Sequence, residues 1–266
     1  IILISALSGL LVIVGYLVAR GSGVVIALVV SAVMNFGSYW FSDSIVLKMY
    51  NARPVTQMEA PALYGSVGNL ANRASIPLPK IYIIPSDTPN AFATGRNENH
   101  AAVAVTAGLL KMMNKDEVEG VLAHELSHIK NKDILISTMA ATIASAVVMV
   151  SRWSVFFNND DGGTVSAVAV AMIAPVAATL VQMAISRSRE YEADAGSAGI
   201  TGNPVALANA LMKLSGTARL KPLGANPATA HMFIVNPLSG GTIMGLFSTH
   251  PPVEKRVKRL LAMKGS

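Results

Sequence analysis

Residues 124–128 read His-Glu-Leu-Ser-His, a spacing of side chains that can hold a metal ion. Histidines four positions apart on a helix project from the same face about one turn apart, so both imidazoles can reach one ion. Glu125 is adjacent and can take a proton from metal-bound water, whose pKa zinc lowers to about 7. The pattern predicts a zinc site with His124 and His128 as ligands and Glu125 as general base, although such a short pattern also arises by chance.

A catalytic zinc site needs a third protein ligand and one open position. The chain has no cysteine, so this ligand must be a histidine, an aspartate or a glutamate. Glu190 and Asp194 are four residues apart and share a helix face, so that one can bind zinc while the other orients a histidine. Glu192 points about 200° away from Glu190 on such a helix. The alternative is that these acids only pair with Arg187 and Arg189 on a solvated helix turn.

Two further residues are candidates for stabilising a transition state. A positioned donor near the developing oxyanion typically contributes about 3 kcal/mol. His250 precedes Pro251-Pro252, whose fixed φ angles stiffen the start of a final helix, and Arg256 lies in the second turn of that helix. The alternative is that His250 caps this helix and Arg256 pairs with Glu254 or with solvent.

The elements that position these residues follow from capping signals and periodicity. Asn114 and Glu117 have the spacing of a capping box, so we expect a helix to begin there and to carry both histidines. This helix is expected to continue through Lys130–Asp133 into an apolar segment. Short connections predict a small antiparallel sheet. Its expected strands are Lys80–Ile84, Asn90–Thr94 and Ala101–Thr106.

The second of these strands has a functional interpretation. An edge strand beside a metal lets an extended substrate add to the sheet through main-chain hydrogen bonds. We therefore expect substrate to bind along Asn90, Ala91, Phe92 and Ala93. The alternative is an ordinary edge strand.

The composition predicts an integral membrane protein. Of the 266 residues, 52% are hydrophobic and 14% are charged, whereas a soluble domain carries about 25% charged residues. Gly21–Gly23 joins two apolar stretches into a tight hairpin, which argues against a cleaved signal peptide, and the start at Ile1 predicts that a few residues precede it. Four uncharged stretches approach the roughly 20 helical residues that span a bilayer. They are Ile1–Ala19, Val24–Ser42, Ile134–Ser151 and Thr164–Ser186.

The basic residues predict the orientation. The net charge is +6, but no basic block is interleaved with aromatic residues, which argues against binding to nucleic acid. Only Arg20 and Arg152 flank the apolar stretches on the side away from the polar part of the chain. Because basic flanks mark the cytoplasmic face, the catalytic part is expected to face the cytoplasm. The residues on that side are Lys48, Arg53, Lys130, Lys132, Arg187 and Arg189.

Four motifs in this order make the chain resemble the HtpX-type membrane metalloproteases, which are similar to the CAAX prenyl endopeptidases. The motifs are His124–His128, Arg189–Asp194, Asn90–Ala93 and Thr249–Pro252. In the prenyl-protease relatives, a His-Pro-Pro run followed by an arginine recurs near the zinc, which adds weight to the prediction for the final helix.

This resemblance implies the individual roles. His124, His128 and Glu190 would hold one zinc in a gluzincin-like site, with Glu125 as base and Asp194 supporting His124. It also implies an endopeptidase of the bacterial inner membrane that degrades misfolded or damaged membrane proteins from the cytoplasmic side.

The expected fold is therefore an α+β integral membrane protein, mainly helical, with four transmembrane helices and a cytoplasmic gluzincin-like protease domain. The expected parts are an N-terminal transmembrane hairpin (1–42), a catalytic part with the sheet and the zinc helix (43–133), a second hairpin (134–186) and a C-terminal helical part that completes the zinc site (187–266).

Two other classes of protein fit less well. A transporter is disfavoured because Gln182 is nearly the only strongly polar residue of the apolar stretches and none of them holds an ionisable one. A zinc-stabilised membrane scaffold without catalysis is disfavoured by Glu125, since a structural metal site has no use for an acid beside the metal.

Overall fold

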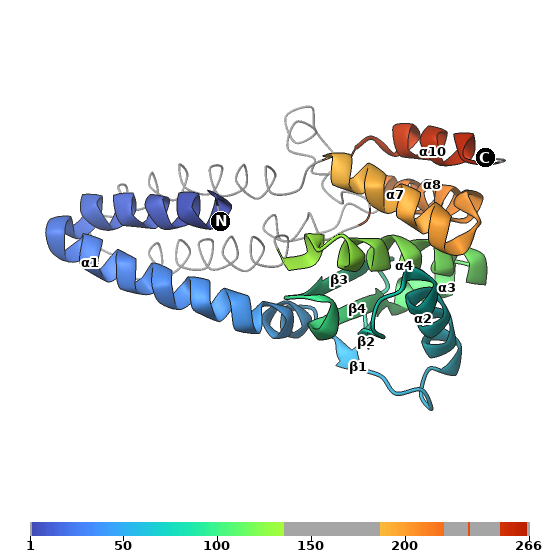
Figure 1. The fold of residues 1–266 in the computed structure, drawn as a ribbon, viewed down its shortest axis with the longest axis horizontal. Coiled ribbons are helices and arrows are strands. Elements are labelled where there is room, and N and C mark those ends of the chain that lie inside the picture. The colour runs from blue at the N-terminus through green and yellow to red at the C-terminus, as the bar shows by residue number, and fades with distance from the viewer. Residues whose placement is uncertain (1, 136–186, 221–233, 235–250, 265–266) are drawn as a thin grey trace.

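The structure is a computed structural model that describes residues 2–135, 187–220, 234 and 251–264 (Figure 1). It is mainly helical with one small sheet. The helices are α1 (Ile2–Met49), α2 (Pro61–Ala74), α3 (Ala107–Met112), α4 (Lys115–Lys130), α7 (Arg187–Thr201), α8 (Pro204–Leu220) and α10 (Val253–Ala262). The strands are β1 (Arg53–Pro54), β2 (Lys80–Ile84), β3 (Ala91–Gly95) and β4 (Ala101–Thr106), and the short 3₁₀-helix η1 (Glu98–His100) joins β3 to β4.

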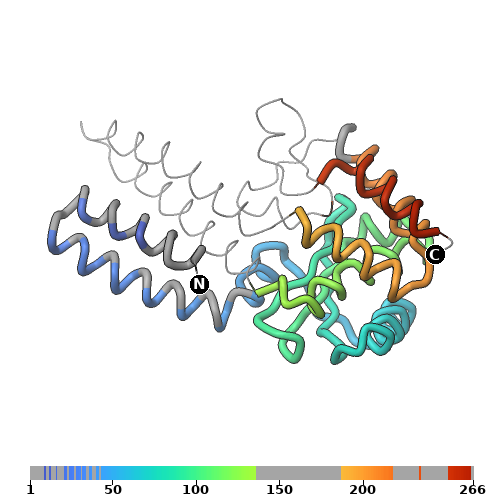
Figure 2. The backbone as a smooth tube through the Cα atoms, turned by 45° about the horizontal axis from the view of Figure 1, so that its top comes forward, coloured from blue at the N-terminus to red at the C-terminus, as the bar shows by residue number. Residues whose placement is uncertain are grey.

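The N-terminal α1 projects away from the other elements. We expected a loop at Gly21–Gly23, but these residues are helical and belong to α1. The two views nevertheless show α1 turning back on itself (Figures 1 and 2). Many large apolar side chains of α1 are exposed. They are Tyr16, Val25, Ile26, Leu28, Val29, Val30, Val33, Phe36, Trp40, Phe41, Ile45 and Met49.

The four expected transmembrane helices are not confirmed. Among the described residues, no helix combines the length and the apolar character required to cross a membrane. The second expected hairpin falls on residues 134–186, of which 136–186 lie outside the described residues.

The sheet is mixed, so the prediction of an antiparallel sheet was wrong in one pairing. Its strand order is β1-β2-β4-β3, with β2 parallel to β4 and the other two pairs antiparallel. The reason is that the chain after β2 crosses the end of β4 before it forms β3. Gly108 N donates to Ser86 O at 2.9 Å, and Asn90 N donates to Thr106 Oγ1 at 2.8 Å. This crossing makes β3 an edge strand of the sheet in the described part of the chain.

Alternate residues of β4 face two separate apolar clusters. Val103 and Val105 belong to the larger core, which includes α2, α4 and α8. Ala102 and Ala104 belong to a smaller cluster with Val46 near the end of α1. This period of two is that of a strand buried on both faces, and it fixes the end of α1 against the sheet.

The helix that carries the two histidines begins where the capping signal predicted. The Asn114 side chain accepts from Glu117 N, and the Glu117 side chain accepts from Asn114 N. α4 ends at Lys130, and a turn at residues 131–132 precedes further helical residues at 133–135, so the expected uninterrupted helix through Asp133 was wrong. Lys132 has a positive φ of 62°, which interrupts the helix and turns the chain.

Candidate metal centre

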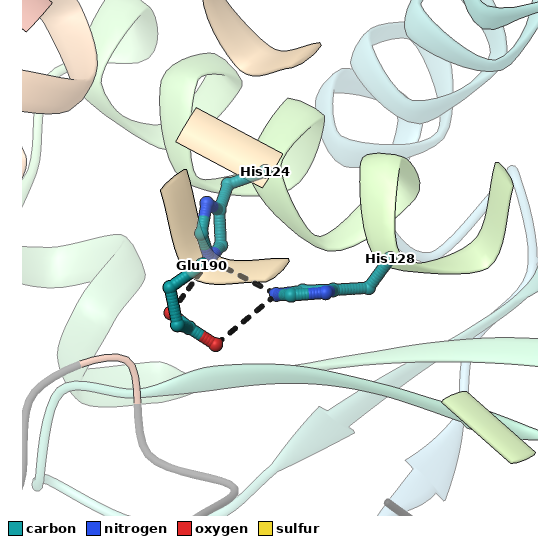
Figure 3. A group of neighbouring side chains, drawn as sticks. All are labelled: His124, His128 and Glu190. Carbon is teal, nitrogen blue, oxygen red and sulfur yellow. Dashed lines mark hydrogen bonds and ion pairs between the residues drawn. The ribbon is translucent and has the colours of Figure 1, made fainter. Parts of the chain in front are cut away.

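Two helices bring three metal-ligating side chains together (Figure 3). His124 and His128 lie one turn apart on α4, and Glu190 comes from the first turn of α7. The Nε2 atoms of the histidines are 3.3 Å apart. Glu190 Oε2 lies 3.7 Å from His124 Nε2, and Glu190 Oε1 lies 3.6 Å from His128 Nε2.

These separations fit a zinc ion. Zinc bound tetrahedrally at Zn–N distances of about 2.0–2.1 Å holds two ligand nitrogens about 3.3 Å apart. Two imidazoles and one carboxylate are a ligand set of catalytic zinc sites and leave the fourth position open. His124, His128 and Glu190 are therefore the residues of the described chain that could hold the metal.

Small residues allow α4 and α7 to approach closely enough for this. Ser197 Oγ on α7 donates to Gly120 O on α4 at 2.7 Å. Gly196 faces Ser127, and a Cβ atom at Gly196 would lie 2.4 Å from Ser127 Oγ. The close contact of α4 and α7 therefore depends on the absence of a side chain at Gly196, near the candidate metal ligands.

Asp194 and Arg256 form a buried ion pair behind His124. Arg256 Nε and Nη2 donate to the two Asp194 oxygens at 2.9 and 2.6 Å. Asp194 Oδ1 lies 3.1 Å from His124 Nδ1, on the ring edge opposite the atom that faces Glu190. Burial opposes ionisation of Asp194, but the Arg256 guanidinium outweighs it, so the pKa of Asp194 lies below its ordinary value.

Arg256 lies in the site but has several partners there. It is fully buried, so it is not the solvent-exposed side chain that the alternative interpretation predicted. Besides Asp194, its Nη1 donates to Ile234 O at 3.1 Å and lies 3.5 Å from Glu190 Oε2. These contacts hold α10 against α7 at the metal centre.

Glu125 lies between the histidines and the edge strand. Its Oε2 accepts a hydrogen bond from Ala93 N of β3 at 2.9 Å. Burial raises the pKa of Glu125, although His124 and His128 oppose this increase. A carboxyl group with a raised pKa is better suited to accept and return a proton near neutral pH.

The strand expected to bind substrate is an edge strand of the described sheet and lies next to Glu125. Ala93 directs its N–H to Glu125 rather than to β4. The Phe92 side chain packs on the other face, in the cluster with Val46. Asn90 Oδ1 accepts from Ile234 N at 3.3 Å, so this residue also contacts the C-terminal part of the chain.

One contact of the site was not predicted from the sequence. Asp133 Oδ2 lies 3.2 Å from His128 Nδ1. Burial lowers the pKa of His128, but the hydrogen bond with Asp133 and the charges of Glu190 and Glu125 outweigh it and raise this pKa to about 9. On the continuous helix that we expected, Asp133 would have faced away from His128, so no local pattern indicated the contact.

Of the remaining candidates, Glu190 and Glu192 lie in different environments. Glu190 is buried, whereas Glu192 is exposed, as expected for two positions on different faces of a helix. His250 lies outside the described residues, so its predicted role stays a prediction.

Comparisons with known proteins agree on the family. The model of peptidase family M48 matches residues 58–264. A protein named "Protease HtpX homolog" from Desulforapulum autotrophicum is 54% identical over 269 residues, covering 97% of this chain and 87% of that protein. The protein of the same name from Pyrococcus furiosus is 55% identical over 268 residues, covering 97% of this chain and 93% of that protein.

A solved structure shares the fold. The crystal structure of S. mikatae Ste24p matches with a TM-score of 0.51 and 21% sequence identity over 89% of this chain. This chain spans 57% of that chain, and at such identity the similarity concerns the fold alone. Because the family model covers most of the sequence and the relatives match nearly all of it, this chain belongs to peptidase family M48 and is a metalloprotease.

Proposed function

We propose that this chain is a membrane-embedded, zinc-dependent endopeptidase in which His124, His128 and Glu190 hold one zinc ion. The observation that carries the proposal is the convergence of these three buried or half-buried side chains beside Glu125 and the edge strand β3 of the described sheet. Zinc bound there would supply an activated water and polarise the scissile carbonyl.

Glu125 is the proposed general base. Its Oε2 is held by the N–H of Ala93, which leaves Oε1 to accept a proton from the attacking water and to pass it to the leaving nitrogen. Asp194 orients His124 through the ring edge away from the metal, and Arg256 holds Asp194 in place.

Arg256 and His250 are proposed to stabilise the negative charge of the transition state. Arg256 Nη2 lies 3.4 Å from His124 Nε2, so its positive charge is close to the reacting centre. His250 immediately precedes Pro251 and the helix that carries Arg256. A donor at this point is worth about 3 kcal/mol.

Peptide substrates are proposed to bind along β3. An extended peptide added to this edge would pass beside Glu125, and main-chain pairing tolerates many sequences. Asn90, Ala91, Phe92 and Ala93 are the residues of this proposed site. Its main contribution is the backbone of Ala91 and the carbonyl of Ala93, because the N–H of Ala93 is bound to Glu125.

The proposed location is the plasma membrane, with the catalytic part on the cytoplasmic side. Support comes from the exposed apolar residues of α1 and from the four uncharged stretches of the sequence. The proposed substrates are misfolded or damaged membrane proteins, because a protease held at the bilayer meets these first.

The test uses the full chain purified in detergent, with metal content and casein cleavage measured together. We expect about one zinc per chain, and we expect a chelator to abolish cleavage. Glu125→Gln should retain the metal and lose at least about a hundredfold in cleavage rate. Glu119→Gln, on the same helix and bound to Ser66, is the control that should cleave normally.

The outcomes separate the competing functions. Zinc in the wild type without cleavage would indicate the structural scaffold. Cleavage by Glu125→Gln at a rate near that of the wild type would remove this residue as the base.

A further inference from the structure

The two histidines of the site each have an acidic partner on the ring edge away from the metal. Asp194 lies beside Nδ1 of His124, and Asp133 lies 3.2 Å from Nδ1 of His128. In both rings Nε2 faces Glu190. Asp133 is buried, with 8% of its surface exposed, so this contact is largely removed from solvent.

A local change of the backbone brings Asp133 to His128. Five residues further along a regular helix, a side chain points about 140° away from the starting residue. Here α4 ends at Lys130, and Lys132 adopts a left-handed conformation with a φ of 62°. A lysine is uncommon in this region and persists there where the surrounding structure over-determines it.

A second residue holds Asp133 from the other side. Arg189 Nη1 lies 3.5 Å from Asp133 Oδ1, while Asp133 Oδ2 faces His128. Arg189 directly precedes the ligand Glu190 on α7. The ion pair therefore joins the end of α4 to the start of α7, at the two points where the chain enters and leaves residues 136–186.

We propose that Asp133 is the positioning residue of His128 and that Arg189 keeps Asp133 in place. Asp133 accepts a hydrogen bond from Nδ1–H, which fixes the tautomer in which the lone pair of Nε2 is directed at the metal. The Asp133–Arg189 pair also sets the spacing between His128 and Glu190, since Asp133 contacts His128 and Arg189 directly precedes Glu190.

This inference rests on the proposed metal site, and its test is the affinity for zinc rather than cleavage. The full chain in detergent is titrated against a competing chromophoric chelator, and the cobalt-substituted protein supplies the ligand-field spectrum. The thermal midpoint of the chelator-treated protein is measured alongside. Asp133→Ala should weaken zinc binding about 10–100-fold and shift the cobalt spectrum, with little change in the metal-free midpoint.

Three further variants sharpen the test. Asp133→Asn keeps the shape and one acceptor, so its loss should be smaller than that of Asp133→Ala. Arg189→Gln should weaken zinc binding less than either, and Arg189→Lys should restore part of the loss. Asp87→Asn removes an exposed carboxylate paired with Lys111, and its zinc affinity should equal that of the wild type.

Each outcome supports or overturns the proposed role of Asp133. Zinc affinities within about twofold of the wild type for both Asp133 variants would overturn the proposal, as would a loss that tracks a lower metal-free midpoint in both. If Asp133→Ala fails to fold, Asp133→Asn decides alone. A wild type that binds no zinc would instead overturn the proposed function.

Discussion

Glu190 and Glu192 are two residues apart on α7 and lie in opposite environments. Glu190 faces both histidines, whereas Glu192 is exposed. We expect Glu190→Ala to abolish stoichiometric zinc because it removes one of the three proposed ligands. Glu192→Ala should retain one zinc per chain. Metal analysis after gel filtration distinguishes them, and the reverse result would contradict the ligand assignment.

The ion pair of Asp194 and Arg256 makes stability depend on pH. Asp194→Asn removes the nearer of the two carboxylates that face the buried Arg256 guanidinium, and breaking a buried pair in this way typically costs about 3–5 kcal/mol of unfolding free energy. Because the pKa of Asp194 is lower in the folded chain than in the unfolded chain, this stabilisation is complete above the unfolded value of about 3.9. It is lost as the pH falls through the folded pKa.

Urea unfolding of the chelator-treated protein measures this effect. The difference in unfolding free energy between the wild type and Asp194→Asn should be constant from pH 7 to pH 5 and smaller at pH 3. A difference that grows as the pH falls would contradict the assigned direction of the pKa shift.

At the scale of elements, the crossing of α4 and α7 sets the distance between the histidines and Glu190. A Cβ atom at Gly196 would lie 2.4 Å from Ser127 Oγ and 2.8 Å from Ser127 Cβ. Gly196→Ala should therefore push the helices apart, lower the unfolding free energy by about 1–3 kcal/mol and weaken zinc binding. Chelator competition and urea unfolding measure the two effects.

The same helices supply a control and a rescue. In the described part of the chain, no atom beyond the adjoining backbone of α7 lies within 4 Å of a Cβ atom built on Gly199. Gly199→Ala should therefore bind zinc normally and gain up to about 1 kcal/mol from helix propensity. Ser127→Gly removes both atoms that Gly196→Ala would meet, so the double variant should recover zinc affinity. Lack of recovery would show that the contact does not set the spacing.

At the scale of the molecule, α1 is joined to the catalytic part at one end and extends from it. Val46 packs with the sheet, and the Arg96 guanidinium lies 4.7 Å from the centre of the Trp40 ring. This attachment should hold the apolar surface of α1 in a fixed direction relative to the candidate metal centre, as the proposed action at a bilayer requires.

The proposed orientation can be tested with cysteine labelling, because the chain contains no cysteine of its own. Cysteines placed at Ser22 and at Asn159 should react with an impermeant reagent added from outside the cell, since both positions are expected on the side away from the cytoplasm. A cysteine at Lys111, on the exposed surface of the catalytic part, should react only after lysis. Labelling of Ser22 and Asn159 from the cytoplasmic side alone would reverse the orientation.

Local patterns determined a large part of this protein. The spacing of His124 and His128 and the capping box at Asn114 and Glu117 depend on residues within one or two helical turns, and the structure has both features where they were expected. The separation of Glu190 from Glu192 follows from helical geometry in the same way.

Only the tertiary structure decided the rest, because it depends on contacts between distant segments. The parallel pairing of β2 with β4 results from the chain crossing the end of β4, which short connections alone do not reveal. Arg256 reaches Asp194 across 62 residues of sequence. Asp133 meets His128 because Lys132 adopts a left-handed conformation, and nothing about a lysine favours that conformation until the surrounding packing imposes it.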